Sequence, residues 1–212
     1  MTVSTARVVT GGVLALAAAY LVLGNLVHHV VSPLTPPDPH ELFAAGDRFS
    51  SAAEGVHQEV LGLDGDGWIR LRLQVDPGAE GPPLHVHHGF DEHFVVTEGV
   101  LSVEYGDGVR TLKAGDELLV PAGTPHRPFN PHAEAVTVEG PGPTMPGTFA
   151  ACLALLYPAM EAGGPAVPLQ LSVLGDDCDT HIAEMPRPVE LAMRAVLAPA
   201  GRLLGFGWTP RG

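Results

Sequence analysis

The chain has 212 residues, which is enough for one ordinary domain with additional segments or for two small domains. Its 11 lysines and arginines stand against 24 acidic residues, and the formal net charge of −13 repels phosphate backbones and argues against a nucleic acid partner. The 26 glycines and 21 prolines show no repeat period, so they favour short strands joined by tight turns and a mainly β core.

The first predicted element is an apolar segment from Val8 to Val31 that contains no lysine, arginine, aspartate or glutamate. Its length suits a helix that crosses a bilayer, so we expect a transmembrane helix or signal anchor over residues 1–31. A cleaved signal peptide is the alternative, with small residues at 17–19, but the apolar run continues well past them. Arg7 precedes the segment and the next basic residue is Arg48, which predicts a single-pass membrane protein whose remaining chain is extracytoplasmic.

A proline-rich linker and a run of strands follow. Residues 32–40 read SPLTPPDPH, and their prolines predict an extended spacer without helix, which we place at 32–46. Short alternating apolar runs then predict a β domain over 47–140. The expected strands are 56–63, 68–75, 92–96, 101–105, 109–112, 117–120 and 135–139.

The last part of the chain, residues 141–212, is predicted to be a helical extension. Arginines and apolar residues recur at roughly helical spacing between 187 and 204, although Pro199 is expected to end or kink that helix. Such amphipathic helices pack on the β domain or on a second subunit, or they contact a membrane surface. Cys152 and Cys178 lack the spacing of a zinc or thioredoxin motif, and a single disulfide between them is left open.

Four histidines and two acids gather in the stretch HVHHGFDEH, residues 85–93. In an extended strand His85 and His87 point to one face and His88 to the other, so only the first two can converge on one ion. After a turn at Gly89, the next strand returns Glu92 to that face and leaves His93 at the surface. A lone histidine is usually a satisfied polar side chain, but the spacing of this group favours a metal site.

These residues resemble the paired motifs of the cupin superfamily. His85, His87, Glu92 and Gly99 match H-x-H-x4-E-x6-G, and the second motif, G-x5-P-x-G-x2-H-x3-N, is matched at the positions that follow. Its residues here are Gly115, Pro121, Gly123, His126 and Asn130. The family pattern also begins with a glycine at the position that is Ala79 here, with Gly78 one place earlier, which we interpret as a shifted turn.

The resemblance implies a single antiparallel β-barrel of jelly-roll type whose interior holds a divalent metal ion. The implied ligands are His85, His87, Glu92 and His126, and three imidazoles with one carboxylate suit Fe, Mn, Ni, Cu or Zn without choosing among them. Glu92 is also the implied catalytic base if it moves off the ion. Phe94 and Phe129 are weaker candidates for a substrate pocket, because Phe94 follows Glu92 on its strand and Phe129 follows His126.

Three functions are compatible with this pattern. The first is a metal-dependent dioxygenase or other oxidoreductase acting on a small organic molecule, with isomerases, decarboxylases and hydrolases as rivals on the same scaffold. The second is a metabolite-binding or sensory module without catalysis, and the third is a structural role in which a metal only stabilises the fold. Cupin-like barrels often associate, so the resemblance also admits a homodimer.

Overall fold

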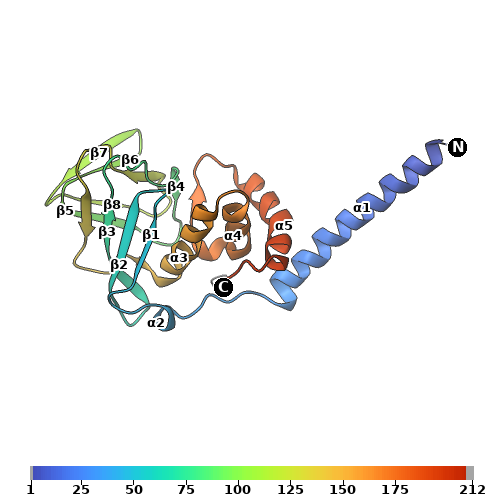
Figure 1. Cartoon of the computed structure of the whole chain (residues 1–212), viewed down its shortest axis with the longest axis horizontal. Coiled ribbons are helices and arrows are strands. Elements are labelled where there is room, and N and C mark those ends of the chain that lie inside the picture. The colour runs from blue at the N-terminus through green and yellow to red at the C-terminus, as the bar shows by residue number, and fades with distance from the viewer. Residues whose placement is uncertain (1, 209–212) are drawn as a thin grey trace.

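The computed structural model describes residues 2–208, and its elements fall into an N-terminal helix, a β region and a helical region (Figure 1). The N-terminal elements are α1 (Thr2–Leu26), a π-helical turn (Val27–Val31) and α2 (Pro39–Leu42). The strands of the β region are β1 (Arg48–Ser51), β2 (Val56–Leu63), β3 (Trp68–Val75), β4 (His85–Val86), β5 (Glu92–Glu98), β6 (Val100–Tyr105), β7 (Gly108–Lys113), β8 (Glu117–Val120), β9 (His126–Phe129) and β10 (Val136–Glu139). The C-terminal elements are β11 (Met145–Pro146), α3 (Gly147–Ala162), α4 (Ala166–Leu174), a 3-10 turn η2 (Gly175–Cys178), β12 (His181–Ile182) and α5 (Arg187–Leu203).

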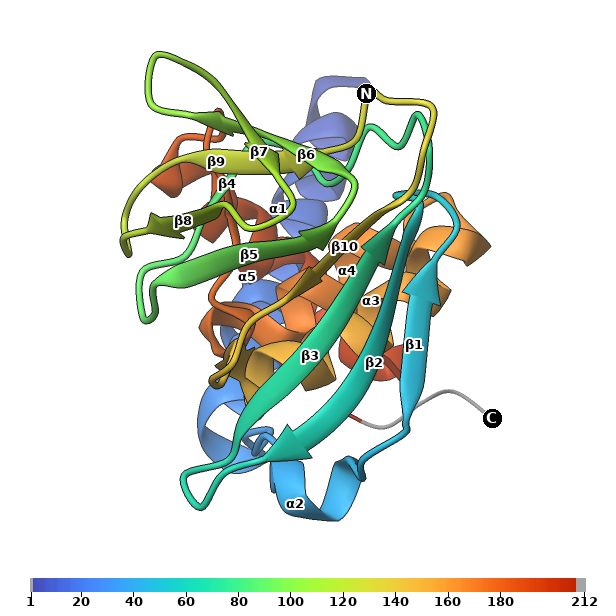
Figure 2. The same ribbon diagram turned by 90° about the vertical axis from the view of Figure 1, so that its left-hand side faces the viewer.

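The strands form two antiparallel sheets that face each other across the core, as the end-on view shows (Figure 2). One sheet has the order β1-β2-β3-β10-β5-β8, with β11 added beside β3, and the other has the order β12-β4-β9-β6-β7. The antiparallel β-barrel of jelly-roll type that the resemblance implied is confirmed only in part, because no ladder joins the two sheets into a closed barrel within the described residues. The expectation of short antiparallel strands is confirmed.

Side-chain alternation explains why these runs form strands. In β3 the residues Ile69, Leu71 and Val75 are buried while the arginines between them are exposed, as the period of two predicts. The core between the sheets contains Phe94, Val96 and the inward residues of β6, together with Tyr157 from α3. A helix of the C-terminal extension thus completes the core of the sheets.

The C-terminal extension, residues 141–212 in the sequence-based division, is not only helical. Its β11 pairs with β3, and its β12 pairs with β4, so two short strands extend the sheets. A disulfide joins Cys152 on α3 to Cys178 at the end of η2, which settles the pairing that the sequence left open. The helices α3, α4 and α5 lie together beside the β region (Figure 1).

One helix within residues 2–208 is long and apolar enough to cross a membrane, over Thr10–Val31, a test that a signal sequence near the N-terminus also passes. Its last turns pack against α5. The Tyr20 hydroxyl donates to the carbonyl of Val196 at 2.6 Å, and a Cβ placed on Gly24 would lie 2.6 Å from Cβ of Pro199.

The predicted absence of helix from the linker is wrong, and Pro199 does not end helix α5. The linker contains the short helix α2, where Pro39 occupies the first position and loses no hydrogen bond by lacking an N–H. Helix α5 also continues through Pro199. A proline leaves the carbonyl four residues earlier without its helical partner, and here the Asn25 side chain of α1 donates to that Ala195 oxygen at 2.8 Å.

Candidate metal centre

Strands β4, β5 and β9, with His87 directly after β4, bring the four motif side chains to one point between the sheets. His85 on β4 stands opposite His126 on β9 in the ladder, and Glu92 begins β5 in the facing sheet. One ligand atom from each of His85, His87, Glu92 and His126 lies within 4.8 Å of the others, and the group could hold a metal ion. The three imidazoles are buried.

Backbone carbonyls fix the orientation of all three imidazole rings. Nδ1 of His85 lies 2.9 Å from the carbonyl oxygen of Pro83, and Nδ1 of His126 lies 2.9 Å from that of Thr124. Nδ1 of His87 lies 2.6 Å from the carbonyl oxygen of Asp179. A carbonyl only accepts, so each Nδ1 carries the proton and each Nε2 is left to face the centre, as in metal-binding histidines.

The donor atoms of the centre fit a cation. Nε2 of His126 lies 2.6 Å from a carboxylate oxygen of Glu92, and Nε2 of His87 lies 3.5 Å from the same oxygen. Among the described residues His87 Nε2 has no hydrogen-bond partner although it is buried, which is costly for a polar atom. Two nitrogen lone pairs close to a carboxylate need a positive charge between them, and a divalent ion or a proton can supply it.

Burial and charge act on the pKa values of these groups in opposite directions. Burial lowers the pKa of His85 to about 4, although the carboxylate of Glu92 opposes it, so His85 is neutral near pH 7. Burial alone would raise the pKa of Glu92, but the hydrogen bond to His126 and the nearby imidazole of His87 hold it well below its ordinary value. The neutral imidazole and the ionised carboxylate are the protonation states that metal ligands require.

The other predicted residues of the region have varied positions. His88 is exposed, and His93 lies at the surface with Nε2 3.1 Å from the Glu117 carboxylate, so neither joins the cluster. Phe94 is fully buried and lines the cavity beside the cluster. Phe129 lies outside the described lining of that cavity, because from His126 the alternation turns Pro128 inward and Phe129 toward Arg127.

The motif residues that carry no ligand atom support the turns around the centre. Gly78 has a φ of +70°, which glycine adopts freely, in agreement with the shifted turn inferred for Ala79. Asn130 is fully buried, and its side-chain amide donates to the carbonyl of Asp76 at 3.0 Å and to that of Glu134 at 2.8 Å. Asn130 therefore ties two loops together.

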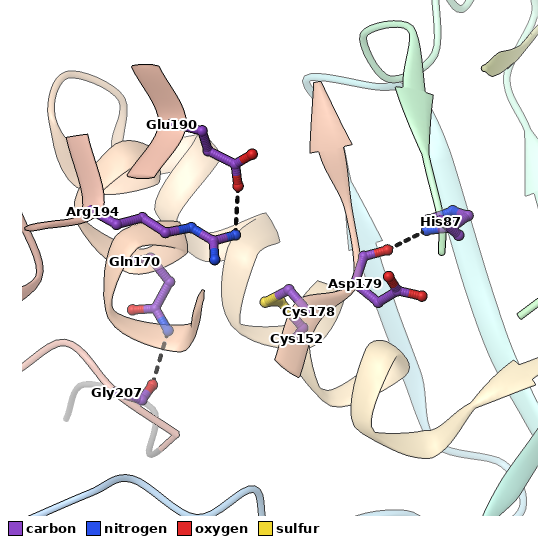
Figure 3. The surroundings of a disulfide bond; sticks show 8 residues. All are labelled: His87, Cys152, Gln170, Cys178, Asp179, Glu190, Arg194 and Gly207. Atoms are coloured by element: carbon purple, nitrogen blue, oxygen red, sulfur yellow. Dashed lines mark hydrogen bonds and ion pairs between the residues drawn. A yellow bond between two sulfur atoms is a disulfide. The ribbon is translucent and has the colours of Figure 1, made fainter. Parts of the chain in front are cut away.

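The sequence motifs did not identify Asp179. Its backbone oxygen orients His87, and its carboxylate accepts from the backbone N–H of His88 at 2.9 Å and of Gly89 at 2.7 Å. Asp179 follows Cys178, so the disulfide fixes this segment beside the centre (Figure 3). Its φ of +38° is the left-handed conformation that aspartate tolerates better than most residues, and this was not evident from the sequence.

The cluster opens on a cavity of about 220 Å³ between the sheets and the helices α3 and α4. Phe149 of α3 contacts the His87 ring edge-on, with ring centroids 4.7 Å apart, and Phe90 stacks on the same ring at 4.4 Å. An apolar enclosure of this kind limits the access of water and strengthens the electrostatic interactions of the cluster.

Comparisons with known proteins agree with the motif. Residues 71–138 match the family model Cupin_2, described as a cupin domain. An oxidoreductase of Pestalotiopsis fici, iacF, is 36% identical over 90 residues, which cover 40% of this chain and 44% of that protein. An epoxidase of Aspergillus terreus, atD, is 32% identical over 96 residues, which cover 44% of this chain and 27% of that protein.

The matches cover only part of each protein. This chain spans less than half the length of these two curated relatives. A solved structure described as a sugar phosphate isomerase of the cupin superfamily, from Silicibacter pomeroyi, is 27% identical, with a TM-score of 0.38 over 44% of this chain and 65% of that one. The family match and the motif together support the placement of residues 71–138 in the cupin superfamily.

Proposed function

We propose that His85, His87, Glu92 and His126 bind a divalent metal ion, and that the protein is an oxidoreductase acting on a small organic molecule. The observation that carries the proposal is that three imidazoles, each held through Nδ1 by a backbone carbonyl, and one carboxylate have ligand atoms that all lie within 4.8 Å of one another. Iron, manganese, nickel, copper and zinc all accept this mixture of nitrogen and oxygen ligands.

When bound, the ion supplies Lewis acidity and, if it is redox-active, electron transfer. The three histidines hold it as neutral donors. Glu92 is ionised at neutral pH, so it ligates the ion or accepts a proton from a substrate that lies beside it. Phe94 and Phe149 close the adjacent cavity with apolar surface and keep water away from the reacting molecule.

The names of the two fungal relatives, an oxidoreductase and an epoxidase, support redox chemistry over the rival reactions of the scaffold. A metabolite-binding module without turnover is the alternative. An oxygen electrode distinguishes the two: the iron-, manganese- or nickel-loaded protein is expected to consume oxygen with at least one member of a panel of phenols and diketones. A ligand that copurifies or raises the melting temperature without turnover would favour the binding module.

Metal analysis of the full chain, purified in detergent without added metal, tests the centre itself. We expect close to one transition metal ion per chain, and a loss of most of it in His85→Ala and in His126→Ala. His93→Ala is the matched control, because this histidine belongs to the same sequence cluster but lies at the surface. Metal content that is equal in all four proteins would refute the site.

We also propose the division of the chain into a membrane anchor (1–31), a linker (32–46), the cupin domain (47–140) and the C-terminal extension (141–212), with the cupin domain on the extracytoplasmic side. The Cys152–Cys178 disulfide supports this side, because disulfides persist in oxidising compartments. The orientation is tested with a reporter that is active only in the cytoplasm. Fused to the C-terminus, this reporter should show no activity. The mass of the purified chain shows whether the first segment is retained or cleaved.

A further inference from the structure

We propose that the cavity beside the cluster binds a neutral, largely apolar molecule with one hydroxyl or carbonyl group, and that Gln58 and Tyr157 recognise this polar group. The inference rests on the proposed function only in taking the His–Glu cluster as the reactive part of the cavity. Gln58 lies on β2, and Tyr157 lies on α3 of the C-terminal extension, outside the segment that matches the cupin model.

The chemistry of the cavity wall selects against anions. Its apolar residues include Leu71, Leu73, Val138, Leu153, Leu156 and Met160. No lysine or arginine occurs among the lining residues that the structure describes, whereas two carboxyl groups, Glu54 and Glu92, do. Away from the cluster and the ion proposed there, a phosphate or carboxylate group would lose its hydration without gaining a positive partner, and such a burial is strongly unfavourable.

Gln58 and Tyr157 supply a polar site in this apolar wall. Both line the cavity, and they are 5% and 3% exposed. Gln58 Nε2 donates to the Tyr157 hydroxyl at 2.7 Å, and Gln58 Oε1 is buried without a partner among the described residues. Rotating the amide by 180° exchanges the two atoms, so either orientation leaves one polar atom of Gln58 unpaired.

An unpaired buried oxygen is destabilising, and a ligand hydroxyl that donates to it removes the cost. The Tyr157 hydroxyl, which accepts the bond from Gln58, can donate its own proton to a ligand carbonyl or hydroxyl oxygen. Burial, then the charge of Glu54, raises the pKa of Tyr157 despite the bond to Gln58, so this proton stays in place at neutral pH. The pair therefore recognises one uncharged oxygen function.

The position of the pair suits recognition at a distance from the cluster. In the sheet order β2-β3-β10-β5, the strand of Gln58 is three places from the strand of Glu92, which corresponds to roughly 14 Å along the sheet. A ligand held by its oxygen at the pair thus presents a different part of its skeleton to the cluster.

Three probes with one ring system test the inference: 2-naphthol, naphthalene and 2-naphthyl phosphate. Their affinities for the full chain in detergent are measured by fluorescence, before and after removal of metal with a chelator. We expect 2-naphthol to bind at least tenfold more tightly than 2-naphthyl phosphate in both states. Gln58→Leu and Tyr157→Phe should each weaken 2-naphthol binding by about three- to tenfold, the usual effect of one lost hydrogen bond, and leave naphthalene binding unchanged.

Gln74→Leu is the matched control, because it makes the same chemical change on the exposed face of the neighbouring strand β3, and it should change none of the affinities. The micelle background is the same for every variant. If Gln58→Leu does not fold, the naphthol affinity of Tyr157→Phe tests the inference instead, since this substitution removes one oxygen atom and keeps the ring.

Phosphate binding as tight as naphthol binding would overturn the inference, as would naphthol affinity that neither substitution changes. Metal content measured on the same samples separates this result from the proposed function. A chain that carries no metal as purified, before any chelator is added, and that shows the expected naphthol pattern refutes the metal centre alone. A protein with metal that does not discriminate among the probes refutes the present inference alone.

Discussion

The β sheets and the C-terminal extension contribute different things to the candidate site. The β region supplies all four side chains of the cluster, three from strands and His87 from the residue after β4, at positions that follow a strict pattern in the sequence. The extension supplies the carbonyl that orients His87, the aromatic ring of Phe149 against that histidine, and the hydroxyl of Tyr157 in the cavity. The β region thus supplies the candidate metal ligands, while the extension supplies their surroundings and part of the cavity wall.

The largest expected effect comes from removing the disulfide of the extension, which tests whether this cross-link holds the extension against the sheets. In Cys152→Ala/Cys178→Ala, a cross-link between residues 26 positions apart is lost. Constraint of the unfolded chain by such a loop is worth about 3 kcal/mol, so urea unfolding should give a free energy of unfolding lower by that amount. Unchanged stability would mean that the remaining packing of α3 and η2 holds the extension in place without the cross-link.

The second prediction concerns Glu54, which the extension helps to bury at the turn between β1 and β2. Burial raises the pKa of Glu54 from its ordinary 4.5 to about 7. A carboxyl with a higher pKa in the folded chain binds more protons there than in the unfolded chain, so stability is lost as the pH rises from about 4.5 to about 7. Glu54→Gln removes this pH-dependent loss of stability, because the amide does not ionise.

We expect Glu54→Gln to be more stable than the parent chain by about 2 kcal/mol at pH 8. This value is reduced because the carboxyl group is partly exposed to solvent. At pH 4 the two proteins should be equally stable. Thermal or urea unfolding at the two pH values measures the difference. A gain in stability of equal size at both pH values would assign the effect to packing rather than to ionisation. The charge of Glu54 would then not depend on its burial by the extension.

The third prediction sharpens the comparison at Asp179. Asp179→Gly keeps the backbone carbonyl that orients His87 and tolerates the positive φ, but it removes the acceptors for the N–H groups of His88 and Gly89. Groups that position metal ligands typically affect metal affinity by 10-fold or more, so we expect about a tenfold rise in the metal Kd.

Competition with a chromogenic chelator measures this affinity. Asp179→Asn is the conservative control, because it retains one oxygen acceptor and also tolerates the left-handed conformation, and it should lie between the parent and Asp179→Gly. Parent-like affinity in Asp179→Gly would show that the loop 88–89 holds its shape without the carboxylate, and that the backbone contact to His87 suffices.

The parts of the molecule that follow local rules could be predicted from the sequence. Strands such as 56–63 and 68–75 are short runs bounded by turn residues, with clear alternation in 69–75, and were placed at their observed bounds. The parity of the HVHHGFDEH stretch correctly separated His85 and His87 from His88 and His93. These inferences need only the period of a strand and a turn at Gly89.

The parts that depend on distant contacts could not be predicted. The short strands β4, β9 and β12 exist because partners far along the chain pair with them, and two or four residues carry no periodic signal. Asp179 has no motif neighbour, and its role depends on a disulfide and on an unusual backbone conformation. Pro199 failed as a helix terminator because α1, some 170 residues earlier, satisfies the carbonyl that it leaves free.

That last contact affects how the whole molecule would sit at a bilayer. Because the side chains of Tyr20 and Asn25 bond to α5, and the bare backbone of Gly24 fits against Pro199, the globular part is braced on α1 rather than tethered by a loose linker. Tyr20 and Asn25 both fall within Thr10–Val31, so with α1 inserted as a span, the part of α5 that bonds to them would lie at bilayer depth beside the helix. The domain would then not tumble freely, and it would inherit the tilt of α1.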